Sequence, residues 1–234
     1  MKNRQLSLIM FIFAQLYVYI SLICFNDFIN SKIMALISIF LCFIISISLF
    51  CKTKDYYLML SAITISLISD IFFIFFDNLS YIGLIGLNIV QLLYFLRIYL
   101  DSDYKKSNVL SRIIVLPFIT LITFLVLRER INIEAILWVW FSTNLFINIL
   151  FTIKEIGINN LFPIGLLLLF AFSASLMLTN VGNYVNSNIR LLNFIENLPF
   201  DLTHVFYIPA QVVLTCSIFT VNRRCFSKIK QDEE

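Results

Sequence analysis

The chain has 234 residues, of which 60% are hydrophobic and 13% are charged. Soluble domains carry about 25% charged residues, and no soluble core could bury this much apolar surface, so the composition excludes a soluble globular protein and indicates a chain that lies largely in a lipid bilayer. The net charge of +3 is too small to indicate a nucleic-acid partner.

Eight apolar segments follow one another along the chain, each about 17–21 residues long, which is the length of helix that crosses a bilayer. Backbone groups in lipid must be paired within their own segment, and the segments do not alternate with period two, so each is expected to be a helix. The predicted fold is all-α, a polytopic membrane protein with eight transmembrane helices in one bundle. The expected helices span approximately residues 5–25, 33–51, 57–76, 80–99, 110–127, 133–152, 161–179 and 204–221.

The connections between these segments predict a single domain over residues 1–234. The first apolar run is too long for a signal peptide and is not followed by a small-x-small cleavage site, so it is expected to remain as the first helix. Most connections are short, which favours antiparallel neighbours; the exception is 180–203. Residues 222–234 are expected to form a short cytoplasmic tail.

The basic residues are divided unevenly between the two sides that this topology defines. The positive-inside rule assigns the richer side to the cytoplasm, which places both termini there and the 180–203 connection outside. The basic residues are interpreted as signals of topology and as contacts to lipid headgroups. The richer set has 13 members, Lys2, Arg4, Lys52, Lys54, Arg97, Lys105, Lys106, Arg112, Lys154, Arg223, Arg224, Lys228 and Lys230, and the poorer set has 4, Lys32, Arg128, Arg130 and Arg190.

The sequence offers no pattern for a metal or a disulfide framework. Five cysteines lie scattered in or beside the apolar runs without a CxxC pair, and His204 is the single histidine. No metal site and no cofactor are therefore expected.

Asp70 is the most informative residue, because it lies inside the apolar run 57–76. A carboxylate at that depth costs several kcal/mol unless it is paired, solvated or protonated, and intramembrane acids are functional by default. Ser66 and Asp77 lie four and seven residues away and so share its helix face. We expect Asp70 to point into the bundle, within hydrogen-bonding reach of Gln91, Tyr207 or Gln211. The alternative to a functional acid is a purely structural hydrogen bond to Gln91 or Tyr207.

Further polar residues lie on the other predicted helices, mostly between mid-bilayer and the outer surface. Their simplest arrangement is one polar pocket among the third, fourth, sixth, seventh and eighth helices, entered from the outer side. Asn, Gln and Ser in such helices also often only bridge neighbours, Asp77 and His204 could be solvated at the boundary, and Tyr207 could belong to an interfacial aromatic belt. These residues are Asn88, Gln91, Tyr94, Asn144, Asn148, Ser173, Ser175, Thr179, Asn180, His204, Tyr207 and Gln211.

Three short motifs resemble those of the YhhN family of eight-helix membrane proteins, which includes the lysoplasmalogenases. They are Ser66-Leu67-Ile68-Ser69-Asp70-Ile71-Phe72 followed by Asp77, then Gly83-Leu84 through Gln91-Leu92-Leu93-Tyr94, and finally Tyr207-Ile208-Pro209-Ala210-Gln211. The chain departs from the family pattern in three places. Ser69 stands where the family often has Gly, Gln91 where it often has His, and Ser173 at the expected position of a helix-seven acid.

The resemblance implies hydrolysis of the vinyl ether of a lysophospholipid in a bacterial cell membrane. Protonation of the vinyl ether gives an oxocarbenium-like cation, so this chemistry needs a proton donor and a second group that stabilises the cation or activates water. Glycoside hydrolases use two carboxyl groups in the same way. Asp70 fits the donor, and Asp77 or Asp201 would have to fill the second role. The candidate substrate-binding residues are Gln91, Tyr94, Tyr207, Gln211, Asn144, Ser173 and His204.

The alternative is a non-catalytic membrane protein that binds or transports lipid or forms part of an assembly. The missing helix-seven acid is what a chain that kept the fold and lost the chemistry would show. Membrane lipids are the expected partners in either case.

Overall fold

The computed structural model describes residues 2–24, 30–48, 52–128, 132–156, 160–184 and 202–232, and there it is all-α. The helices are α1 (Lys2–Cys24), α2 (Ser31–Ser48), α3 (Lys54–Phe75), α4 (Ser80–Asp101), α5 (Lys105–Leu127), α6 (Ile133–Ile156), α7 (Leu161–Tyr184) and α9 (Leu202–Asp232), with a short 3₁₀ helix η1 (Asp77–Leu79) between α3 and α4.

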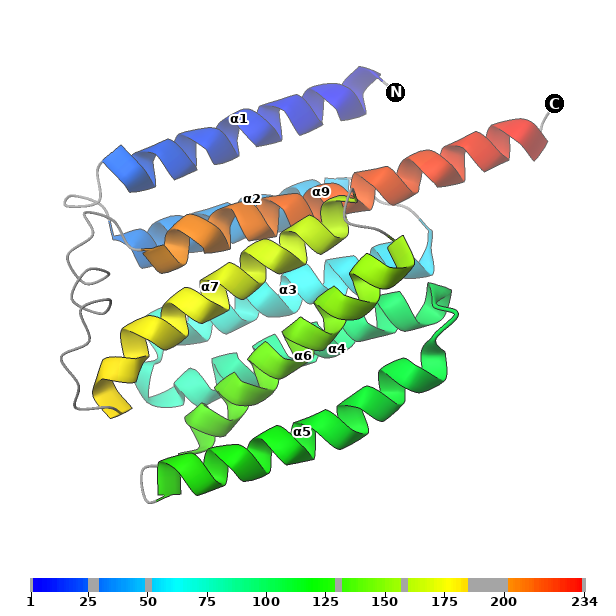
Figure 1. Cartoon of the computed structure of the whole chain (residues 1–234). Helices are drawn as coiled ribbons and strands as arrows, with labels where there is room; N and C mark the ends of the chain where they lie inside the picture. The colour runs from blue at the N-terminus through cyan, green and yellow to red at the C-terminus, as the bar shows by residue number, and fades with distance from the viewer. Residues whose placement is uncertain are drawn as a thin grey trace.

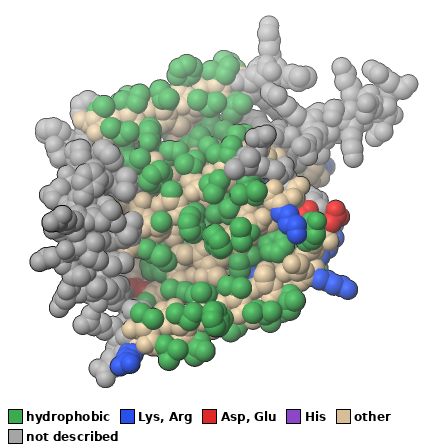
Figure 2. All heavy atoms as spheres, in the orientation of Figure 1, with side chains coloured by type: hydrophobic (Ala, Val, Ile, Leu, Met, Phe, Trp, Pro, Cys, Tyr) green, Lys and Arg blue, Asp and Glu red, His purple; other side chains and the backbone are tan. Residues whose placement is uncertain are grey.

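Within the described ranges, six helices, α1 to α6, are long and apolar enough to cross a membrane. Helices α7 and α9 contain shorter apolar stretches, Leu161–Met177 and Thr203–Ile218. Figure 2 shows hydrophobic side chains over most of the described part of the visible face, with charged side chains near its ends. An apolar outer surface over long apolar helices is what an integral membrane protein presents to lipid.

The helices lie side by side in a bundle with α1 and α5 at opposite edges (Figure 1). The most extensive contacts are between α7 and α9, between α3 and α4, and between α4 and α6, whereas α5 packs mainly on α6. The start of α1 and the end of α9 lie at the same end of the bundle. Helix α9 packs on α7, the described helix before it in the chain, and also on α2 and α3, which are far from it in the sequence.

Each expected helix lies within or overlaps a helix of the structure, but several bounds differ. Helix α5 begins at Lys105 rather than near 110, and α9 continues to Asp232 rather than ending near 221. Apolar runs mark only the part of a helix that lipid would surround, while Lys, Arg and Gln are good helix formers in water. The 222–234 tail is therefore helical as far as Asp232.

Glycines permit two of the close helix contacts in the centre. A Cβ on Gly86 of α4 would overlap the Ser69 hydroxyl of α3, and a Cβ on Gly165 of α7 would lie 2.7 Å from the Leu214 Cγ of α9. Small residues allow helix backbones to approach in a membrane, where van der Waals packing drives association. Ser69 is the neighbour of Asp70, so the Gly86 contact sets the position of that acid relative to α4.

Candidate functional site

Asp70 is held between α3 and α9 by a hydrogen bond. The Tyr207 hydroxyl donates to Asp70 Oδ2 at 2.7 Å. Tyr207 is buried, with 4% of its surface exposed, and its ring lies 4.9 Å from that of Phe172 on α7. Tyr207 is one of the three partners expected for Asp70, and this hydrogen bond confirms that the carboxyl group points into the bundle.

His204 adds a titratable group to the same place. It lies one turn before Tyr207 on α9, a spacing that puts the two on one helix face, and its imidazole interacts electrostatically with the Asp70 carboxylate. Asp70 follows Lys54 by sixteen residues, which is about 24 Å along α3. The acid therefore lies toward the η1 end of α3, near the first turns of α9.

Several buried polar atoms on these helices and on α4 have no hydrogen-bond partner among the described residues. They include Ser66 Oγ one turn before Asp70, Gln91 Nε2 and Tyr94 OH on α4, and Gln211 Oε1 one turn after Tyr207. A buried polar group without a partner costs about 1–3 kcal/mol, so a polar ligand or water would stabilise this region.

Other predicted site residues have partners elsewhere in the bundle. Asn148 Nδ2 donates at 3.0 Å to both Gln91 Oε1 and the Gln91 carbonyl, joining α6 to α4. Asn144 Oδ1 accepts from Arg112 on α5. The Ser173 hydroxyl lies 2.7 Å from that of Ser142 on α6. The expected single pocket is thus divided into an Asp70 group on α3 and α9 and separate bridges that involve α6.

The second acid of the predicted pair has no described side chain. Asp77 is the first residue of η1, and its side chain, like the whole of Asp201, lies outside the described residues. In the part of the chain that the structure describes, no group of three or more His, Cys, Asp or Glu side chains could hold a metal ion. The described chemistry around Asp70 consists of one carboxyl group, one phenol and one imidazole.

An ion pair that the sequence reasoning missed lies at the opposite end of α3. Arg97 Nε is 2.5 Å from Asp55 Oδ1, and Nη2 donates to Oδ2 at 3.1 Å. Arg97 also donates to Ser217 at 2.9 Å and lies 4.2 Å from the centre of the Phe162 ring. These contacts tie α3, α4, α7 and α9 together. The signal was an acid in the first turn of one helix and a base in the last turns of the next, which a short hairpin brings to the same end.

Arg112 was also missed as a site residue, because it was counted only as a topological charge. Its side chain is buried, with 7% exposed, and it donates to Asn108, Asn144 and Asn148. The available signal was its position inside the apolar run 110–127 rather than before it.

No protein-family model, curated protein or solved structure with which the chain was compared matches it.

Proposed function

We propose that this chain is an eight-helix membrane protein that hydrolyses the vinyl ether of a lysophospholipid in a bacterial membrane, with Asp70 as the proton donor. The observation that carries the proposal is the hydrogen bond from Tyr207 to Asp70 Oδ2. An acid placed between two helices of an apolar bundle, beside further polar groups, suits a reaction on a lipid.

The topology proposed here has eight crossings with both termini in the cytoplasm. Support comes from the six long apolar helices, from the apolar stretches in α7 and α9 that run beside them, and from the 13-to-4 division of Lys and Arg. The positive-inside rule relates that division to the cytoplasmic side.

The proposed reaction uses each polar group of the Asp70 site. Tyr207 donates to Oδ2, which leaves Oδ1 of Asp70 to carry the proton. That proton passes to the vinyl carbon that is not bonded to the ether oxygen, and the π electrons of the double bond form the new C–H bond. The resulting oxocarbenium ion takes up water, and the water proton passes to His204 or to the Asp70 carboxylate. The hemiacetal hydroxyl then loses its proton and forms the aldehyde carbonyl, while the C–O bond to glycerol breaks and the departing oxygen takes up a proton to give the glycerophospho-alcohol.

The direct test is release of fatty aldehyde from a vinyl-ether lysolipid by the purified protein in detergent. Asp70→Asn keeps the shape of the side chain and removes its acidic proton, so turnover should fall by about 10²-fold or more. Asp103→Asn is the matched control, because Asp103 is an exposed carboxylate in the α4–α5 connection and should leave turnover unchanged. An Asp70→Asn variant as active as the wild type would overturn the role of Asp70.

The second candidate function is lipid binding without catalysis. It is favoured by the pairing of Ser173, where the resemblance implies an acid, with the Ser142 hydroxyl, and by the lack of a second described carboxylate in contact with Asp70. A wild-type protein that is inactive on every vinyl-ether lysolipid would favour this candidate. Activity gained by Ser173→Asp would then identify the chain as a family scaffold that lost one catalytic group, and no gain would leave Ser173 without that role.

A further inference from the structure

Arg112 is a buried cation with neutral neighbours. Its Nε donates to Asn108 Oδ1 at 3.3 Å, Nη1 to Asn144 Oδ1 at 2.5 Å and Nη2 to Asn148 Oδ1 at 2.7 Å. The guanidinium also lies 4.4 Å from the centre of the Phe95 ring. Among the described residues, the ion pair of the chain is the one between Arg97 and Asp55, so no described carboxylate neutralises Arg112.

The position of Arg112 makes this arrangement costly without an anion. Arg112 follows Lys105 by seven residues, which is about 10 Å along α5, inside the apolar span Lys105–Val126. Charged side chains within a membrane normally pair with an opposite charge or reach the interface. A guanidinium has five N–H donors, and three of them are used by the asparagines, so two remain for an anion.

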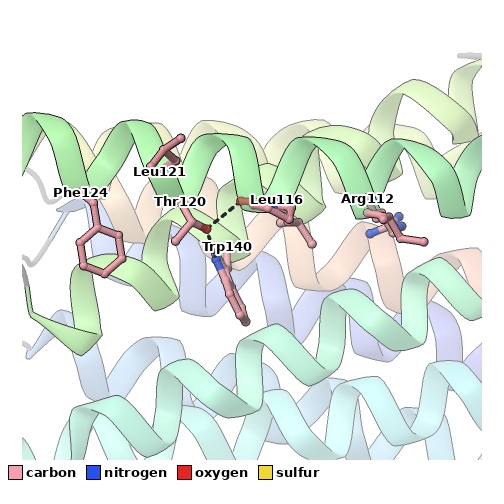
Figure 3. A pocket seen from close by; sticks show the side chains of 8 residues that line it. Arg112, Leu116, Thr120, Leu121, Phe124 and Trp140 are labelled. Carbon is pink, nitrogen blue, oxygen red and sulfur yellow. Dashed lines mark hydrogen bonds between the residues drawn. The ribbon is translucent and has the colours of Figure 1, made fainter.

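A groove of about 690 Å³ extends from Arg112 along α5, beside Trp140 of α6. Its walls are otherwise almost wholly apolar and include Leu116, Leu121, Phe124 and Trp140. Figure 3 shows Arg112 at one end of this row and Phe124 at the other, with Trp140 between them. The Thr120 hydroxyl in the groove already accepts from the Trp140 indole at 2.7 Å.

The groove has the length of a lipid acyl chain. The twelve residues from Arg112 to Phe124 cover about 18 Å of helix, and the hydrocarbon of one leaflet is about 15 Å thick, half of the core.

Basic residues also continue from Arg112 toward the membrane surface. Lys105 shares its helix face at a spacing of seven, and Lys154 lies at the neighbouring end of α6, over the Tyr104 ring. The described acids at that end are Asp103, which is exposed in the α4–α5 connection, and Glu155, which accepts from Ser102.

We propose that the α5–α6 groove binds an anionic phospholipid, whose phosphate pairs with Arg112 and whose acyl chain lies along Leu116, Leu121 and Trp140. A phosphate accepts paired hydrogen bonds from a guanidinium. The charge of Arg112 favours an anionic headgroup, because a zwitterionic headgroup also carries a cation, which Arg112 repels. The loose packing of α5, which contacts mainly α6, leaves the groove open to the surrounding lipid. This site is separate from Asp70 and does not depend on the proposed hydrolysis.

The two tryptophans of the chain allow a direct test. Trp138 stacks on Phe73 in the bundle, so Trp138→Phe leaves Trp140 in the groove as the single reporter. The full chain is placed in vesicles that contain phosphatidylglycerol with bromine near the end of its acyl chains, diluted in unbrominated phosphatidylcholine. A second set carries the bromine on phosphatidylcholine at the same mole fraction, diluted in unbrominated phosphatidylglycerol. Bromine quenches tryptophan fluorescence at short range, and we expect phosphatidylglycerol to be preferred about tenfold, the scale of a hydrogen bond to a charged group.

Two variants separate a specific site from general contact with lipid. Arg112→Gln should abolish the preference and Arg112→Lys should reduce it, because lysine keeps the charge without the planar fork. Lys32→Gln, which removes an exposed charge at the start of α2, should leave it unchanged. Equal quenching by the two lipids, or a preference that survives in Arg112→Gln, would overturn the proposal. Lack of quenching by either lipid would also overturn it, since the groove would then be covered by protein.

Discussion

The contact between Gly86 of α4 and Ser69 of α3 predicts a strong coupling between two small substitutions. A Cβ on Gly86 would overlap the Ser69 hydroxyl, while the Ser69 Cβ and the Ile65 Cγ2 would each be 3.5 Å away, at ordinary contact distance. Gly86→Ala should therefore force the hydroxyl to move and break its hydrogen bond to the Ile65 carbonyl, which is 2.8 Å long. Ser69→Ala removes the atom that collides and leaves room for the new methyl group.

The magnitude follows from this single overlap. Overpacking by one methyl group costs about 1–3 kcal/mol, whereas the exchange of Gly for Ala in a helix contributes about 1 kcal/mol in the opposite direction. The net effect of Gly86→Ala alone is thus a small difference between two terms. The helix-propensity term cancels in a double-mutant cycle, so the coupling free energy between Gly86→Ala and Ser69→Ala should be about 1–3 kcal/mol, favouring the double variant.

The assay is the free energy of unfolding of the four proteins in mixed detergent micelles, measured by circular dichroism as the fraction of a denaturing detergent rises. Gly165→Ala serves as a comparison, because its Cβ would meet Leu214 and not Ser69; it should destabilise the protein but show no coupling to Ser69→Ala. A coupling below about 0.5 kcal/mol, the usual limit of additivity for independent sites, would show that α3 and α4 do not meet in this register. The position of Asp70 relative to α4, which follows from the Ser69 contact, would then be wrong as well.

Three further results are expected. Asp55→Asn should lower the free energy of unfolding by about 3 kcal/mol, the low end for breaking a buried ion pair, because the Asp55 side chain is 18% exposed. If Asp55→Asn costs as much in the Arg97→Gln background as in the wild type, the two residues do not form a specific pair. Tyr207→Phe keeps the packing on Phe172 and removes the hydrogen bond to the acid, so stability should fall by about 0.6 kcal/mol while aldehyde release drops, and unchanged release would argue against a role for the phenol. Single cysteines placed in 180–203, in a background without native cysteines, should react with a membrane-impermeant reagent from outside intact cells, and labelling only after lysis would refute the proposed topology.

The sequence by itself determined that the chain is helical and where most helices lie. Runs of apolar residues long enough to cross a bilayer leave the backbone no other way to pair its polar groups, and this holds whatever surrounds each helix. Asp70 and its partner Tyr207 could also be identified from the sequence, since a carboxyl group in lipid needs a polar neighbour and few are available. The ends of α5 and α9 were placed less well, because polar residues continue a helix beyond its apolar run.

Only the tertiary structure decided which polar residues meet. Gln91 was a candidate partner of Asp70 and Asn144 a candidate member of the same pocket, but Asn144 accepts from Arg112 and Gln91 accepts from Asn148, which is the bridging role that the sequence left open. Neither the groove at Arg112 nor the neutral side chains that Arg112 contacts could be predicted from residue spacing. The physical reason is that lipid tails and the bundle interior are equally apolar, so the pattern of apolar residues does not say which face of a helix meets another helix. Close packing at small residues such as Gly86 determines which face meets another helix, and that packing forms only when the chain folds.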